Sequence, residues 1–233
     1  KTVLLAETEH SFRVRAVCGN EVSEWSDAVK GRTQKASEFS ECAWKECPDY
    51  VDERNRRYSV DAKNPRIAIK IKDCDWGYCT IIGNALLPLS KVTSWSVKIL
   101  RSRYNNGNRI YIGIAPFDID QNEYYNHNKC GWYFDCYGST LCSGLPHNYR
   151  DKEYGPRKED GEYVHTGDSV GVVMDTTNGE LSFVLDSVNF GVAYDGIPLD
   201  KPLVPYVLLG FKGDSVELDT SEVKEKVNSS IPV

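Results

Sequence analysis

The stretch that decides the fold is residues 167–185, which read GDSVGVVMDTTNGELSFVL. Its first half, Ser169 to Asp175, is apolar at both odd and even positions except at its ends, which is typical of a strand buried in the middle of a sheet. Asn178 and Gly179 then form a strong turn signal, and residues 181–185 return as a second apolar run. We therefore predict a β-hairpin whose first strand is covered on both faces.

Short apolar runs of the same kind fill the chain around this hairpin. Turn signals such as Asn106-Gly107 and Asp195-Gly196 separate them, at a spacing of about 8 to 12 residues that is typical of an all-β sandwich. No stretch has a convincing helical period. The predicted strands are 66–71, 79–82, 95–100, 109–115, 131–135, 169–175, 180–185, 190–194, 203–210 and 215–218.

The N-terminal part of the chain has a pattern of its own. In residues 11–17 apolar side chains alternate with arginine, Gly19 and Asn20 signal a turn, and a second run passes through Trp25 and Val29. This pattern predicts a β-hairpin with one apolar face. Residues 34–57 are mostly polar and predict a linker or an approach segment that wraps the next domain, in which Trp44 is expected to anchor on that domain.

Composition argues against two classes of partner. The 233 residues carry a formal net charge of −6, so the chain has no general attraction to phosphate backbones or to anionic lipid. No apolar run approaches the roughly 18 residues that a membrane-spanning helix needs. The chain begins at Lys1 and has its only methionine at Met174, so we expect it to be part of a longer protein.

The eight cysteines do not predict a metal site or a disulfide scaffold. Cys42 and Cys47, like Cys74 and Cys79, are more widely spaced than the cysteine pairs of zinc knuckles, and no histidine pair follows them at finger spacing. A domain of this size does not need disulfides for stability. We expect reduced, partly buried thiols in a cytoplasmic protein, with no metal and no cofactor.

Several segments resemble the SPRY (B30.2-like) family. Residues 167–175 followed by 179–183 are similar to that family's paired strands, and Gly191-Val192-Ala193 stands where the family usually has a Gly-x-Ala triplet. Upstream, residues 95–99, 112–115 and 131–132 are similar, in the family's order, to its aromatic strand, its apolar-Gly-apolar-Ala strand and its Gly-Trp strand start. The resemblance implies an antiparallel β-sandwich of the concanavalin-like jelly-roll kind, in which Trp132 is a core residue.

Residues 4–26 resemble the last strands of a fibronectin type III domain. Two positions depart from that family's pattern, with Ala6 in place of its proline and His10 in place of its corner tyrosine. The earlier strands of such a domain are absent from the sequence, which leaves an apolar face and open edges. We therefore predict a partial fibronectin type III-like segment over 1–33, a linker or approach segment over 34–57, a SPRY-like domain over 58–219 and a polar tail over 220–233.

The SPRY resemblance implies a non-catalytic adaptor module that recognises a protein or peptide, often as the substrate-recruiting end of a larger protein. Such a sandwich presents loops, and Trp, Tyr and Arg side chains in loops supply most interface hot spots. By position in the family pattern, the tyrosines before the Gly-Trp strand and the turn before the last strand line the binding site. The predicted contact residues are Tyr124, Tyr125, Leu209, Gly210, Phe211 and Lys212, with Trp76, Tyr78 and Tyr104 as neighbouring aromatic side chains.

Two other classes of function are alternatives to the adaptor module. An enzyme is disfavoured, because the sequence has none of the common nucleophile, metalloprotease or phosphate-loop motifs. A lectin-like carbohydrate-binding sandwich stays open as the alternative, since Trp and Tyr faces also stack on sugars. Residues 118–129 begin like a calcium loop, but Glu123 and Lys129 stand where an EF-hand needs glycine and glutamate. Neither the partner's identity nor the oligomeric state follows from the sequence.

Overall fold

The computed structural model describes residues 9–19, 21–32, 38–47, 57–73, 79–103, 109–119, 131–143, 152–154, 164–221 and 223. The chain divides into two compact units, Lys1–Ser37 and Glu38–Val233. In the part of the chain that the structure describes, no helix has the length and apolarity that crossing a membrane requires.

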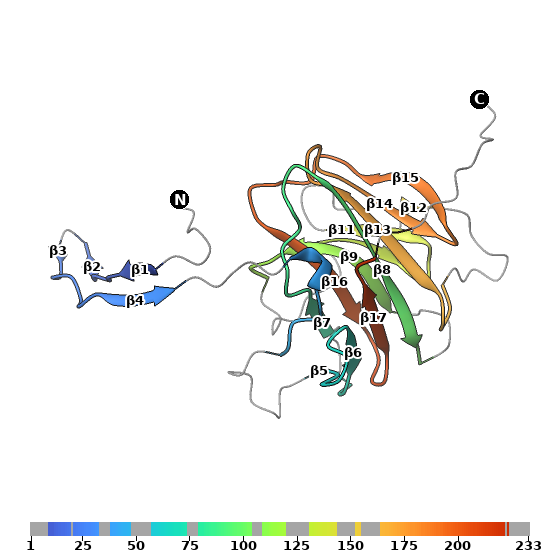
Figure 1. Cartoon of the computed structure of the whole chain (residues 1–233), viewed down its shortest axis with the longest axis horizontal. Helices are drawn as coiled ribbons and strands as arrows, with labels where there is room; N and C mark the ends of the chain where they lie inside the picture. The colour runs from blue at the N-terminus through green and yellow to red at the C-terminus, as the bar shows by residue number, and fades with distance from the viewer. Residues whose placement is uncertain are drawn as a thin grey trace. The chain divides into compact units, whose positions relative to one another are not determined.

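The larger unit is a sandwich of two antiparallel sheets, drawn in Figure 1. The six-stranded sheet has the order β12-β11-β10-β9-β16-β7. Its strands are β7 (Cys79–Ile82), β9 (Ile110–Pro116), β10 (Trp132–Asp135), β11 (Thr140–Ser143), β12 (Lys152–Glu153) and β16 (Leu203–Leu209).

The second sheet has seven strands in the order β15-β14-β13-β8-β17-β6-β5. These strands are β5 (Tyr58–Val60), β6 (Ile67–Lys70), β8 (Val92–Arg101), β13 (Ser169–Asp175), β14 (Glu180–Leu185), β15 (Val188–Tyr194) and β17 (Ser215–Asp219). The prediction of an all-β, antiparallel sandwich is confirmed.

The core lies between the two sheets and follows from the two-residue period of the strands. Along β8, Trp95, Val97 and Ile99 are fully buried, whereas Lys98 on the other face is exposed. Ile112 and Ile114 of β9 join the same core cluster from the opposite sheet. Trp132 is 5% exposed and packs in this cluster, as expected for a core strand.

The hairpin predicted from residues 167–185 is confirmed, with the predicted bounds for β13 and β14. In the four-residue connection that follows Asp175, Gly179 has a φ of +71°, and a Cβ atom there would lie 2.7 Å from the carbonyl oxygen of Ile197. Strand β13 is central in its sheet, but the predicted cover on both faces is only partial: Val170, Val172 and Met174 are fully buried on the inner face, whereas on the outer face Ser169 is exposed and Val173 and Asp175 are half-buried. A Cβ atom on Gly171 would lie 2.9 Å from a methyl group of Val223, which crosses its outer side.

Three strands that the structure describes in the larger unit were not predicted from the sequence, namely β5, β11 and β12. Each is short, and β12 contains only Lys152 and Glu153, which form no apolar pattern. Their pairing depends on a longer neighbour: β12 adds to β11, and β5 adds to β6. Other predicted bounds differ by a few residues, the largest difference being the earlier start of β8 at Val92.

Asp175 at the end of β13 makes the stability of the fold depend on pH. The Thr177 backbone N–H and the Asn178 side-chain amide donate to its carboxylate, at 2.7 and 2.9 Å, and hold the pKa of Asp175 below its ordinary value. A carboxyl group with a lowered folded-state pKa stabilises the fold above its unfolded pKa of about 4, and this contribution is lost as pH falls through the folded pKa.

We expect the difference in free energy of unfolding between wild type and Asp175→Asn to be constant from neutral pH to about pH 5 and to shrink in more acid solution. Urea unfolding at a series of pH values measures this difference. A difference that is the same at every pH would contradict the prediction.

The smaller unit is a two-part hairpin. Strand β1 (Glu9–Phe12) pairs with β4 (Val29–Arg32), and β2 (Val17–Cys18) pairs with β3 (Glu21–Val22). The sequence predicts one continuous strand over 11–17, but the pairing is interrupted where Ser23 and Ser26 accept hydrogen bonds from the backbone N–H groups of Ala16 and Val14. The hairpin prediction is confirmed.

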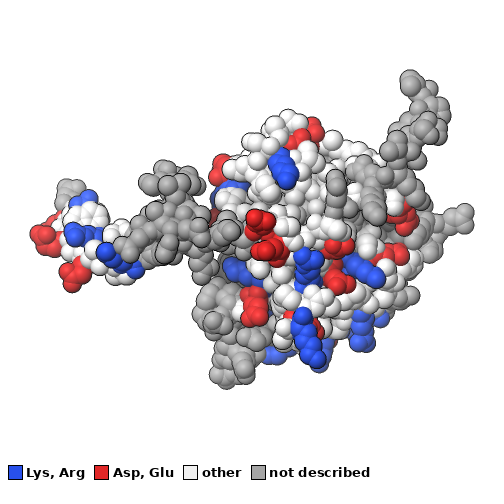
Figure 2. Space-filling view, in the orientation of Figure 1, with Lys and Arg blue, Asp and Glu red and all other residues white. Residues whose placement is uncertain are grey.

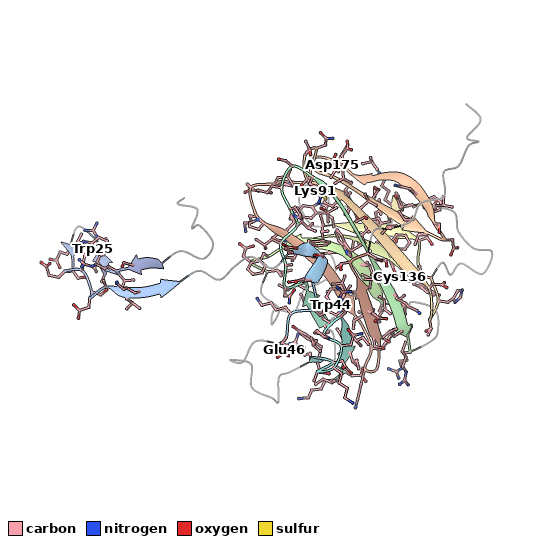
Figure 3. All side chains as sticks on the ribbon, viewed as in Figure 1. Trp25, Trp44, Glu46, Lys91, Cys136 and Asp175 are labelled. Atoms are coloured by element: carbon pink, nitrogen blue, oxygen red, sulfur yellow. The ribbon has the colours of Figure 1, made fainter. Side chains whose placement is uncertain are left out.

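The segment before β5 packs into the sandwich. It contains a 3₁₀ turn (Phe39–Glu41) followed by buried Cys42, Ala43 and Trp44. Trp44 is 2% exposed, donates its backbone N–H to the Pro65 carbonyl and forms an isolated bridge with Gly83. Figure 3 shows Trp44 against the sandwich, and its predicted role as an anchor is confirmed.

Candidate functional site

Of the predicted contact residues, the structure describes Leu209, Gly210, Phe211 and Lys212, which form the turn between β16 and β17. Leu209 ends β16 and is fully buried, so its side chain supports the core beneath the turn. Gly210 and Phe211 are half-buried, and Lys212 is exposed. The surface that this turn offers to a partner therefore consists of the Phe211 ring, the Lys212 side chain and the backbone at Gly210.

A buried ionic network holds the turn in place. Both oxygens of the Asp214 carboxylate accept backbone hydrogen bonds, from Phe211 at 2.8 Å and from Arg103 at 2.9 Å. The Lys70 ammonium donates to the carbonyl oxygens of Leu209 and Gly210, at 3.2 and 2.8 Å. Lys70 and Asp214 are both fully buried, and groups of this kind are tolerated only when paired and hydrogen-bonded. The network therefore fixes the turn relative to β6 and β8.

Burial also sets the electrostatics of this network. It raises the pKa of Asp214, and the backbone N–H groups of Phe211 and Arg103 oppose that rise, as do the cations of Lys70 and Arg103. The Asp214 carboxylate thus interacts with two backbone N–H groups, with buried Lys70 and with exposed Arg103.

Two arginines surround the aromatic ring of the turn. The guanidinium carbons of Arg103 and Arg109 lie 5.2 and 5.1 Å from the centre of the Phe211 ring, within the range of a cation–π contact. Arg109 packs so closely on the turn that a Cβ atom on Gly210 would overlap its Cβ and lie 3.0 Å from its carbonyl oxygen. The Lys212 backbone N–H donates to Asp73 at 2.7 Å.

These contacts bring together the ends of two loops that carry predicted aromatic residues. Asp73 and Cys79 flank residues 74–78, and Cys79 pairs with Leu209 in the sheet. Arg103 and Arg109 flank residues 104–108 in the same way. Three predicted contacts in these two loops lie outside the described residues, namely Trp76, Tyr78 and Tyr104.

The described ends of the segment that contains the predicted tyrosine pair lie at a different end of the sandwich. Tyr124 and Tyr125 lie outside the described residues, but the segment that contains them leaves from Ile119 and returns at Gly131, beyond the far end of β9. In β9 that end is six residues from Ile110, which pairs with Leu209, and this corresponds to about 20 Å along the strand. The described ends of the tyrosine segment and the β16–β17 turn therefore lie at opposite ends of the sheet.

Sequence reasoning missed four residues of this site: Lys70, Asp73, Arg109 and Asp214. Lys70 did carry a signal, since it shares the inward-facing phase of Ala68 in a predicted strand, a position where a lysine is unusual. The other three lie outside any motif, and only their contacts with the turn distinguish them from ordinary polar surface residues.

A shallow polar groove crosses the outer face of the seven-stranded sheet. It consists of two neighbouring hollows, with volumes of about 430 and 350 Å³, that share Ser96 and Ser169. Val223 of the chain itself lines the second hollow, and its backbone N–H donates to Ser94 at 3.1 Å.

The described residues contain no group of three or more His, Cys, Asp or Glu side chains that could bind a metal ion. Burial raises the pKa of the Cys42 and Cys136 thiols, which favours the protonated, unreactive form. Figure 3 labels Cys136, which is fully buried in the core.

The molecule is thus an antiparallel β-sandwich with candidate contact residues on a turn at one end. Residues 92–222 match the family model of the SPRY domain. The match covers more than half of the chain, and the chain belongs to the SPRY family. SPRY domains are generally non-catalytic modules of protein–protein interaction.

Solved structures agree with this fold. The SPRY domain of human HERC1 is 16% identical, with a TM-score of 0.50, and the similarity covers 72% of this chain and 97% of that one. The TRIM65 PSpry domain is 12% identical, with a TM-score of 0.50, over 76% of this chain and 90% of that one. At these identities the likeness shows the fold alone. No curated protein sequence matches the chain.

Proposed function

We propose that this chain is the recognition end of a larger protein and binds a peptide or folded protein through the β16–β17 turn and the loops whose ends meet it. The observation that carries the proposal is the position of Phe211, a half-buried ring on a turn with the guanidinium groups of Arg103 and Arg109 over it. Aromatic residues and arginine are the side chains most enriched at protein interfaces.

The rigidity of the turn supports the same proposal. Asp214 and Lys70 hold it through three hydrogen bonds from within the sandwich, and Asp214 accepts a fourth from the backbone N–H of Arg103. A partner that binds a surface already held in its bound shape loses less conformational entropy than one that must order a loop. Trp76, Tyr78, Tyr104, Tyr124 and Tyr125, which lie outside the described residues, are proposed as further contacts.

The lectin-like alternative receives less support from the same residues. A sugar ring stacks on an open aromatic face, whereas both guanidinium groups lie over the ring of Phe211. The turn therefore offers a ring beside two cations in place of an open stacking face.

Phe211→Ala is expected to weaken partner binding by about tenfold or more, the usual loss when an interface hot spot is truncated. Proteins retained from a cell lysate by the immobilised wild-type chain would be quantified by mass spectrometry and compared with those retained by the variant. Leu89→Ala is the matched control, because Leu89 is 71% exposed and lies in the segment between β7 and β8, outside the site. The control is expected to retain the same proteins as wild type.

The proposal fails if Phe211→Ala and Leu89→Ala retain the same proteins in the same amounts. Binding of the wild-type chain to a glycan array without capture of any protein would instead support the carbohydrate alternative. Thermal unfolding of both variants checks that neither loss reflects a failure to fold.

We further propose that residues 1–33 are the end of a fibronectin type III-like unit, separate from the SPRY-like domain over 58–219 and its approach segment 34–57. Val14, Trp25 and Val29 of the hairpin are 71%, 54% and 68% exposed, a face that further strands of such a unit would cover. The proposal predicts that the hairpin adds nothing to the stability of the sandwich.

The proposed compartment is the cytoplasm, where the buried thiols of Cys42 and Cys136 would stay reduced. Fluorescence microscopy of the tagged full-length protein tests this, and a secreted product would rule it out.

A further inference from the structure

The residues that follow β17 are tied to the segment that approaches the sandwich from the N-terminal side. The Thr220 hydroxyl donates to the carbonyl oxygen of Ser40 at 2.8 Å. The Arg66 guanidinium donates to the same hydroxyl and to the same carbonyl oxygen, at 3.2 and 2.9 Å. Ser40 lies in the 3₁₀ turn before the first strand of the sandwich, and Thr220 follows the last strand. These hydrogen bonds therefore join the two ends of the larger unit.

Beyond Thr220 the chain reaches the outer face of the seven-stranded sheet. The backbone N–H of Val223 donates to the Ser94 hydroxyl on β8 at 3.1 Å. A Cβ atom on Gly171 of β13 would lie 2.9 Å from a methyl group of Val223. Ser94 and Gly171 alternate along their strands with buried core residues, so both belong to the face opposite the core. Val223 thus lies over β8 and β13 on that outer face.

Val184 of β14 completes the surface under Val223. Its neighbours Phe183 and Leu185 belong to the core cluster, so the two-residue period of the strand directs Val184 outward. Val184 is nevertheless only 3% exposed, although it belongs to neither core cluster. An apolar side chain on the outside of a sheet is buried only when another group covers it, and Val184 and Val223 line the same hollow.

Gly171 leaves room for Val223 between these side chains. A methyl group at this position would lie 2.9 Å from Cβ of Val184 as well as from Val223, well inside the optimal carbon–carbon distance of about 3.5 to 4.0 Å. Ser94, Gly171 and Val184, on three neighbouring strands, thus form a depression in the sheet, which we call the outer seat.

A partner selected by its charge fits this face less well than an apolar side chain does. The first hollow of the groove has two cations and two carboxylates among its lining residues, namely Arg66, Lys98, Glu217 and Asp219. Figure 2 shows acidic and basic side chains interspersed on the face of the larger unit that it draws. Where both signs of charge lie side by side, no strong field of one sign attracts a ligand.

We propose that residues 220–223 form a C-terminal clasp, in which Thr220 fastens the approach segment at Ser40 and Val223 docks on the outer seat. The occupant of this part of the outer face is then the chain's own segment. The clasp places the end of the domain at Val223 instead of Asp219, so the polar tail begins after Val223. It also makes the packing of the approach segment depend on residues at the other end of the domain.

Residue-resolved hydrogen exchange of the full chain tests the docking of Val223. Ser94→Ala removes the acceptor of the Val223 N–H, and we expect this amide to exchange at least about fivefold faster than in wild type. Ser96→Ala is the matched control, because Ser96 is the next outward-facing serine of β8 and lines both hollows. The control is expected to keep the wild-type exchange rate.

A double-mutant cycle tests whether Val223 fills the outer seat. Gly171→Ala is expected to raise the unfolding equilibrium constant, because the added methyl group meets Val223 and Val184. In the Val223→Ala background the methyl group has room on one side, so its effect on that constant is expected to be at least about fivefold smaller. Val192→Ala replaces Val223→Ala in the control cycle, since Val192 is 54% exposed and lies on β15, two strands from β13. The control cycle is expected to be additive.

The link to the approach segment is tested separately. Thr220→Val keeps the shape of the side chain and removes the hydroxyl that joins Ser40 and Arg66. We expect the N–H groups of Glu41 and Cys42, which close the 3₁₀ turn, to exchange at least about fivefold faster. Ser221→Ala leaves the Thr220 hydroxyl in place and is expected to exchange there as wild type.

Three results would overturn the clasp. One is a Val223 amide that exchanges in wild type as fast as in an unstructured peptide, or at the same rate in wild type and Ser94→Ala. Another is additivity of Gly171→Ala and Val223→Ala. The third is unchanged exchange at Glu41 and Cys42 in Thr220→Val. The exchange measurements require no substitution in β13, so they decide the question even if Gly171→Ala fails to fold.

Discussion

Gly113→Ala is expected to lower the free energy of unfolding by about 3 kcal/mol, an effect at the upper end for overpacking by one methyl group. A Cβ atom at this position would overlap the carbonyl oxygen of Trp132 and lie 2.8 Å from Cα of Tyr133. Both of those atoms belong to the backbone of the neighbouring strand β10, so no side chain can rotate away. Strand β10 would have to separate from β9, at the cost of their shared hydrogen bonds.

Urea unfolding of Gly113→Ala and Gly138→Ala provides the measurement and its control. Gly138 lies in the turn after β10, and a Cβ atom there would lie 3.3 Å from side-chain atoms of Asp135 and Thr140 that can move. The control is expected to change the free energy of unfolding by less than about 1 kcal/mol. Equal midpoints for Gly113→Ala and wild type would show that the two strands are not so closely apposed.

This close approach explains one of the sequence motifs. Residues 112–115 resemble the SPRY family in their apolar-Gly-apolar-Ala order, and Gly131 opens the next motif. A Cβ atom on Gly131 would overlap the carbonyl oxygen of Ile114, just as one on Gly113 would overlap that of Trp132. Both glycines thus allow the close approach of the same two strands, β9 and β10.

Trp44→Ala is expected to cost about 3 to 5 kcal/mol, the range found when a buried tryptophan is truncated. Trp44 is 2% exposed and belongs to the main core cluster, although it precedes the first strand of the sandwich by more than ten residues. Its loss would leave a cavity between this segment and the sandwich. Thermal and urea unfolding of the variant measure the effect.

Two controls show whether that effect belongs to the sandwich domain. Trp25→Ala removes an indole that is 54% exposed in the hairpin, and removal of residues 1–37 removes the smaller compact unit; neither is expected to change the unfolding of the sandwich by more than about 0.5 kcal/mol. A loss on removal of residues 1–37 as large as that of Trp44→Ala would mean that the hairpin is part of the same core.

The candidate site was predictable in part. The turn at 209–212 follows from the family pattern, and Phe211 was among the predicted contacts. Arg109, Lys70 and Asp214 were not, because a lysine or aspartate in a strand or turn looks the same in sequence whether it faces solvent or holds a neighbouring loop. The sequence also did not predict that the β16–β17 turn and the described ends of the 120–130 segment lie at opposite ends of the sheet. That arrangement depends on the pairing of β9 with β16, which places Leu209 beside Ile110.

Local sequence was sufficient for the long strands and their hairpin, because their two-residue apolar period and the Asn178-Gly179 turn act over a few neighbouring residues. It was also sufficient for the antiparallel sandwich, through motifs in the family's order. Only the tertiary structure placed β12 beside β11, seated Trp44 in the core, and brought Arg103, Arg109 and Phe211 together over the buried Lys70 and Asp214. Those contacts join residues far apart in the chain, and they form only when both sheets bury their apolar faces against each other.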